Sequence, residues 1–131
     1  MAVVLFLYMS LQMSTKKRYV ITASTFCKRG RVISTANNSY TDSSKFMRYH
    51  AVLANEPYKK YNHAECRAIE LSLKQGKIPH KLVILRYNSE GKLADAKPCK
   101  TCQLAIKLAG IKKVQYSTSG GMETLKGDND E

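Results

Sequence analysis

Two short motifs place metal-binding side chains at the expected starts of two helices. His63 and Glu65 open one helix, and Pro98, Cys99 and Cys102 open another. One imidazole and two thiolates are donors that zinc prefers, and three protein ligands leave the fourth position of a tetrahedral ion to water. A chain that builds this site must bring the two helix starts together. The pair of motifs therefore restricts the possible folds more than any other feature.

The pattern of strand-forming and helix-forming residues predicts the element order β-β-α-α-β-α-β. Four strands are expected, over residues 19–26, 32–35, 81–85 and 113–117. The helices are expected to end near residues 55, 75 and 110. Asn62 is the candidate N-cap of the second helix, and the first helix has three candidates: Asp42, Ser43 and Ser44. Helices that alternate with strands in the second half favour an α/β layered fold.

The combined pattern, His63-x-Glu65 followed by Pro98-Cys99-x-x-Cys102, is the signature of zinc-dependent base deaminases. Over residues 18–118 the chain resembles the cytidine and deoxycytidylate deaminase superfamily, and its compact form resembles small deaminase-domain proteins of bacteriophages. The resemblance implies a three-layer α/β fold in which a mixed sheet of about four to five strands is flanked by helices.

The same resemblance implies the parts of the site. Zn²⁺ would be the cofactor, held by His63, Cys99 and Cys102, and substrate contacts would come from Asn38 and Ala64. Zinc lowers the pKa of a bound water to roughly 7. Glu65, two residues after His63, would take a proton from that water and pass protons to the ring nitrogen and to the departing ammonia. We therefore expect Glu65 to be catalytic and not to bind the metal.

Other side chains leave a second interpretation of the metal site open. Cys66 lies three residues after His63, so it could complete a closed four-ligand site, which would make the zinc purely structural. Otherwise Cys66 is expected to be a small buried residue. His50 is expected on a helix surface, and His80 is expected in a loop.

The chain carries a formal net charge of +12, which favours an anionic partner. The family resemblance implies a cytosine base as substrate, and the positive charge favours a nucleotide of the dCMP or CMP type, which would give the uracil product and ammonia. The alternative substrate is a base within RNA or single-stranded DNA, bound partly through its phosphates. Tyrosines that could stack on the base are Tyr40, Tyr58, Tyr61 and Tyr87, and lysine pairs that could meet phosphate are Lys59–Lys60 and Lys112–Lys113.

The expected deaminase domain, residues 18–118, has a segment on each side. Residues 1–17 are interpreted as an N-terminal extension, and the acidic residues 119–131 as a flexible, frayed tail. The apolar residues 1–13 lack a signal-peptide pattern and are too short to span a bilayer. We expect no membrane partner, a cytoplasmic location (the host cytoplasm if the chain is viral) and, from the family resemblance, a homo-oligomer.

Overall fold

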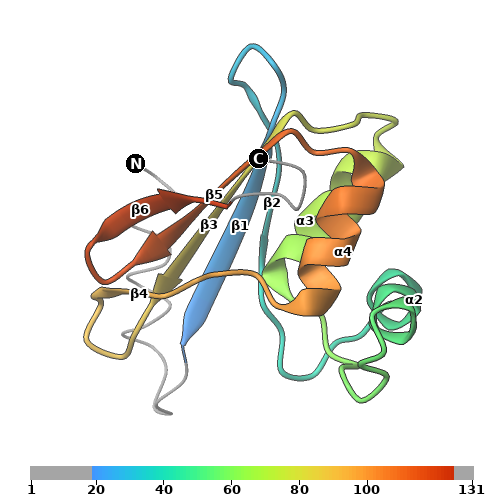
Figure 1. Ribbon diagram of the computed structural model, residues 1–131, viewed down its shortest axis with the longest axis horizontal. Coiled ribbons are helices and arrows are strands. Elements are labelled where there is room, and N and C mark those ends of the chain that lie inside the picture. Colours follow the sequence, from blue (N-terminus) through green and yellow to red (C-terminus); the bar gives the residue numbers. More distant parts are fainter. Residues whose placement is uncertain (1–18, 126–131) are drawn as a thin grey trace.

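The computed structural model describes residues 19–125, which form one mixed sheet with helices packed beside it (Figure 1). The six strands are β1 (Val20–Phe26), β2 (Val32–Asn37), β3 (Lys81–Tyr87), β4 (Leu93–Ala94), β5 (Lys113–Thr118) and β6 (Gly121–Thr124). The order across the sheet is β2-β1-β3-β5-β6, with β4 paired to β3. Strands β3 and β5 are parallel, and the other pairs are antiparallel. The prediction of an α/β fold with a mixed sheet is confirmed, with six strands where four or five were expected.

Three helices are described: α2 (Lys45–Leu53), α3 (Ala64–Lys74) and α4 (Lys100–Ala109). Helix α3 packs on β1 and β2, α4 lies beside α3, and α2 contacts both of them on the side away from the sheet (Figure 1). A helical layer on the opposite face, the third layer of the predicted fold, is not present among residues 19–125. No helix in this part of the chain is long and apolar enough to cross a membrane.

The core lies between the sheet and helices α3 and α4. Alternate residues of a strand point to the same face, and Leu82 and Ile84 of β3 are both fully buried there. They pack in one cluster with Ile69 of α3 and with Ala105 and Ile106 of α4. Helix α4 lies between the parallel strands β3 and β5 in sequence, so it follows the carboxyl end of β3 and leads back to the start of β5. This connection fixes where the first turn of α4 lies.

Buried hydroxyl groups join α3 to the two strands beneath it. Thr25 Oγ1 of β1 lies 2.6 Å from both Ser34 Oγ of β2 and Ser72 Oγ of α3, and the two serine oxygens are 2.9 Å apart. The Ser34 hydroxyl also donates to the Ala68 carbonyl oxygen at 2.7 Å. Buried polar groups are costly unless they are hydrogen-bonded, so this cluster fixes the position of α3 on the sheet.

The sheet extends past the expected end of the domain. Gly121–Thr124 pair antiparallel with β5, and the Tyr116 hydroxyl donates to Glu123 Oε2 at 3.2 Å. The sequence predicted a frayed end from Gly120 onward, whereas the structure continues the sheet to Thr124. The division into an extension, a domain and a tail stays a prediction, because residues 1–17 and 126–131 lie outside the described residues.

Two local predictions in the helical region are wrong. The N-cap of α3 is His63, not Asn62. Asn62 is buried instead, and its Oδ1 accepts a hydrogen bond from the Ser44 hydroxyl at 2.9 Å. His50, expected on a helix surface, is buried, with Nδ1 2.8 Å from the Phe46 carbonyl oxygen. For the first helix, Ser44 is the N-cap among the three candidates, as its hydroxyl accepts the Met47 N–H.

Candidate metal centre

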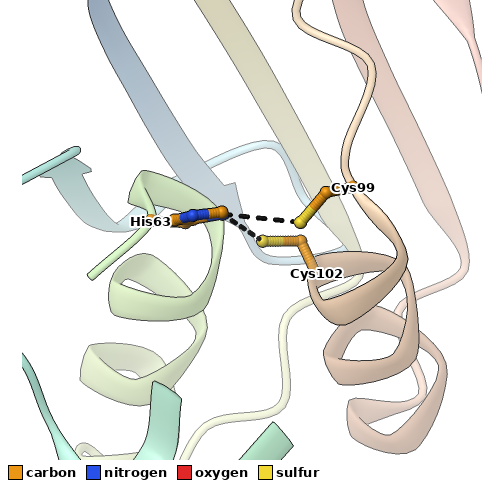
Figure 2. Close-up of side chains that lie close together, drawn as sticks. All are labelled: His63, Cys99 and Cys102. Carbon is orange, nitrogen blue, oxygen red and sulfur yellow. Dashed lines mark hydrogen bonds between the residues drawn. The ribbon is translucent and has the colours of Figure 1, made fainter. Parts of the chain in front are cut away.

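The imidazole and the two thiols of the paired motifs lie together between the starts of α3 and α4 (Figure 2). His63 Nδ1 is 3.5 Å from Cys99 Sγ and 3.3 Å from Cys102 Sγ. His63 is the N-cap of α3, Cys99 is the N-cap of α4, and Cys102 lies in the first turn of α4. The two helix starts therefore lie close together, and each contributes donor atoms to the same metal-binding group.

The spacing of these donor atoms suits a tetrahedral zinc ion. With a Zn–N distance of about 2.0 Å and a Zn–S distance of about 2.3 Å, tetrahedral geometry places nitrogen and sulfur about 3.5 Å apart. The two observed distances, 3.5 and 3.3 Å, are close to this value. All three donor atoms lie within 4.8 Å of one another, so a single ion can contact all of them.

The contacts among the three donor side chains shift their pKa values in different directions. Hydrogen bonds from Cys102 and His63 lower the pKa of Cys99 to about 3, although burial opposes this. The hydrogen bond with Cys99 in turn raises the pKa of His63, again against the effect of burial. Hydrogen bonds with Cys66 and Cys99, together with burial, raise the pKa of Cys102. Zinc ligands must be deprotonated, so the lowered pKa of Cys99 favours zinc binding, whereas His63 and Cys102 would give up their protons when the ion binds.

Cys66 contacts the centre but is not part of the donor group. Its Sγ lies 3.7 Å from Cys102 Sγ, and the side chain is buried. Within residues 19–125, the group of close donor atoms consists of His63, Cys99 and Cys102. This arrangement favours an open site with three protein ligands over the closed site with four.

Glu65 lies next to the donor group without joining it. It is the second residue of α3, it is buried, and it lines the same cavity as His63 and Cys99. Burial raises the pKa of its carboxyl group. A carboxyl group with a raised pKa exchanges protons more readily near neutral pH.

The cavity beside the metal centre has a volume of about 370 Å³, which is within the range of roughly 300–1,000 Å³ for small-molecule sites. Asn38 lines it, immediately after β2. The Asn38 Oδ1 accepts the Ile21 N–H at 3.0 Å, and the Asn38 N–H donates to the Ile21 carbonyl oxygen at 3.0 Å. Both bonds fix Asn38 at the cavity wall. Ala64 is fully buried and is not among the lining residues, so its substrate contact stays a prediction.

The other candidate side chains divide into two groups. Those that line the cavity are Tyr40, Tyr58, Tyr61, Lys59 and Lys60. Those that do not are Tyr87, Lys112, Lys113, His50 and His80.

Residues 3–118 match the family model described as the cytidine and deoxycytidylate deaminase zinc-binding region. The chain belongs to this family. No curated protein sequence gives a match. Among solved structures, cytidine deaminase from Mycobacterium leprae has a TM-score of 0.50 and 18% identity, with 90% of this chain and 88% of that chain covered. Cytidine deaminase from Mycobacterium tuberculosis has a TM-score of 0.49 and 17% identity, with 84% and 75% covered.

Membership of a zinc-binding deaminase family agrees with the donor set. The His63, Cys99 and Cys102 group can hold one metal ion, and the family match covers all three residues. The two findings together identify Zn²⁺ as the cofactor. The similarity to the Mycobacterium leprae enzyme supports the fold alone, and this fold is the one with the mixed sheet described above.

Several residues around the metal centre were not predicted from the sequence. Arg86 and Asp95 line the cavity, and Glu56 joins the loop before α3 to the first turn of α4. No spacing pattern indicates these residues, because their contacts span distant parts of the chain.

Proposed function

We propose that the protein is a zinc-dependent hydrolytic deaminase of a cytosine nucleotide of the CMP or dCMP type. The observation that carries this proposal is one cavity lined by the metal ligands His63 and Cys99, the buried acid Glu65, and Asn38. An open metal position, a proton carrier and a polar residue at the wall are the parts that a deaminase needs. The family match supports the same chemistry.

The chain's own residues carry the proton transfers. When bound, zinc polarises a water molecule and lowers its pKa. Glu65 would accept a proton from the water whose oxygen adds to the ring carbon bearing the amino group, and would pass that proton to the ring nitrogen. It would then carry the remaining proton of the added hydroxyl to the amino nitrogen, so that the C–N bond breaks, ammonia leaves and the carbonyl of the product forms. Burial raises the pKa of Glu65 from its ordinary value toward neutral pH, where a carboxyl group can both accept and donate a proton.

Positive side chains around the cavity favour a substrate with a phosphate group. The cationic lining residues are Lys59, Lys60, Arg86 and Lys97, and the acidic ones are Glu65 and Asp95. Glu65 is buried beside the metal ligands, so Asp95 is the acidic lining residue that is exposed. An excess of cations in a cleft raises the local concentration of anionic ligands. A nucleotide fits this lining better than a neutral nucleoside.

A second candidate substrate, a base within RNA or single-stranded DNA, is favoured by the aromatic lining of the cavity. Tyr58 is 70% exposed, and Tyr40 and Tyr61 are 44% and 48% exposed. Exposed aromatic rings beside lysines form the stacking platforms that bind single-stranded nucleic acids. The flanking bases of a polynucleotide would stack on these rings while the target base enters the cavity.

An ammonia-release assay tests both candidates. The zinc-loaded protein is given dCMP, CMP, their nucleosides, adenosine nucleotides and short oligonucleotides at equal concentrations. We expect the highest kcat/KM with a cytosine mononucleotide and no ammonia release by Glu65→Ala. Activity on oligonucleotides without activity on mononucleotides would replace the first candidate by the second. Absence of ammonia release from every substrate by a protein that holds one zinc per chain would contradict both.

A further inference from the structure

The carboxylate of Glu56 connects two segments that are far apart in the sequence. Glu56 lies in the loop between α2 and α3, and its Oε1 accepts hydrogen bonds from Thr101 of α4: from the N–H at 3.1 Å and from the hydroxyl at 2.7 Å. Its Oε2 accepts a bond from the Tyr58 hydroxyl at 3.1 Å and lies 3.1 Å from Lys59 Nζ. One side chain therefore fixes the first turn of α4 to the loop that leads into His63.

This contact is made in the helical turn that carries the two sulfur donors. Thr101 lies between Cys99 and Cys102 in the first turn of α4, and it is fully buried. The N-cap residue Cys99 makes no side-chain capping hydrogen bond. The first N–H groups of a helix have no partner within the helix, and Glu56 supplies one for Thr101. A negative charge is also favoured at this end of a helix.

Glu56 is ionised in this contact. The hydrogen bond from Thr101, followed by that from Lys59, lowers the pKa of Glu56 to about 2. The Lys59 ammonium that Glu56 holds lines the cavity with Cys99. Glu56 thus orders both the sulfur-bearing turn and a cation next to it.

We propose that Glu56 is a positioning residue for the zinc site: by capping the first turn of α4 through Thr101, it holds Cys99 and Cys102 in register with His63. The proposal rests on the zinc site assigned above, but not on the identity of the substrate. It predicts that loss of the contact weakens zinc binding even in a chain that folds. Residues that support metal ligands typically account for about 10–100-fold in metal affinity or activity.

Zinc affinity, measured by competition with a chromophoric chelator, tests this proposal without any substrate. We expect Glu56→Ala to weaken zinc binding by about 10–100-fold. Thr101→Val removes the hydroxyl bond and keeps the N–H bond, so we expect a smaller loss in the same direction. Thr101→Ser keeps both donors and should bind zinc like the unmodified protein. The absorption spectrum of the cobalt-substituted protein should shift in Glu56→Ala and stay unchanged in Thr101→Ser.

Glu70→Ala is the matched control. Glu70 has a side-chain exposure of 13% against 16% for Glu56, and it also pairs with two neighbours, Arg67 and Lys74, but on α3 alone. Its removal should leave zinc affinity and the cobalt spectrum unchanged. If Glu56→Ala and Thr101→Val bind zinc as tightly as the unmodified protein and Glu70→Ala, the proposal is overturned. If Glu56→Ala does not fold, equal affinities of Thr101→Val and Thr101→Ser would overturn it.

Discussion

Two adjacent residues, Glu65 and Cys66, have different relations to the metal centre. Both are buried on the first turn of α3, but Glu65 lines the cavity, whereas Cys66 lies behind Cys102 at a sulfur–sulfur distance of 3.7 Å. Three ligands with a free carboxylate give a catalytic site, whereas four ligands would give a structural one. Whether Cys66 binds the metal therefore decides between an open catalytic site and a closed structural site.

The variant Cys66→Ala separates these interpretations. We expect it to keep one zinc per chain, measured by atomic absorption after gel filtration, because Cys66 is outside the donor group. Removal of one buried atom should cost about 1 kcal/mol of unfolding free energy, measured in urea. Release of the zinc by this variant would instead make Cys66 a ligand and the site closed.

The donor residues were predictable from the sequence because zinc accepts few side chains and the motif spacing places them at helix starts. Glu56 was not predictable, since its partner Thr101 is 45 positions away in the sequence and an acidic residue in a loop has no distinctive pattern. His50 was predicted wrongly because a single polar residue in a helix usually faces solvent. Here its ring Nδ1 contacts the Phe46 carbonyl oxygen, which allows burial.

At the scale of elements, the start of α2 is connected to the residue before His63. The Ser44 hydroxyl accepts the Met47 N–H at 3.1 Å and donates to Asn62 Oδ1 at 2.9 Å. This N-cap therefore stabilises α2 and also holds the segment that leads into α3. The sequence predicted Asn62 as a cap because Asn is a good cap, but the competing contact with Ser44 engages its side chain.

Replacement of the cap should destabilise the protein. We expect Ser44→Ala to lower the unfolding free energy by about 1 kcal/mol, the typical effect of losing an N-cap. Ser43→Ala is the control, because Ser43 is exposed and its hydroxyl contacts only the Arg48 side chain, at 2.7 Å. Its effect should stay within about 0.5 kcal/mol. Equal losses for the two variants in urea denaturation would contradict the assignment of Ser44 as the cap.

The strands missed by sequence reasoning are the short ones. Strand β4 has two residues and β6 has four, too few to give a clear alternation of apolar and polar side chains. Strand β6 begins at Gly121, whose φ of 134° is a conformation that favours glycine. The glycine pair was interpreted as the start of a frayed tail, but here Gly120 lies in the turn between β5 and β6, and Gly121 pairs with Thr118 of β5.

At the scale of the whole molecule, the metal centre joins elements from both halves of the chain. The ligand His63 comes with α3, which is fixed to β1 and β2, and the cysteines come with α4, which lies between β3 and β5 in the sequence. A bound ion therefore links these two parts. The order of the long elements and the α/β class were predictable from periodicity, but the order of strands across the sheet was not.

Removal of zinc should lower the stability of the entire domain. A ligand that binds only the folded state adds about 2.7 kcal/mol at a concentration 100 times its Kd. For a domain of this size that corresponds to a rise of roughly 10 °C in Tm. We expect a chelator to lower Tm by this order in differential scanning calorimetry, and added zinc to restore it. An unchanged Tm would mean that the three donors hold no ion in the folded protein.

We propose that the site combines an open zinc position with a carboxylate that moves protons but does not bind the metal. Glu65→Ala tests it most directly, with zinc content and ammonia release measured on the same sample and His63→Ala as the comparison. We predict that Glu65→Ala keeps one zinc per chain and loses turnover by at least about 10²–10⁴-fold, the contribution typical of a general acid–base group. His63→Ala should lose both. Turnover retained by Glu65→Ala, or zinc lost from it, would contradict the claim.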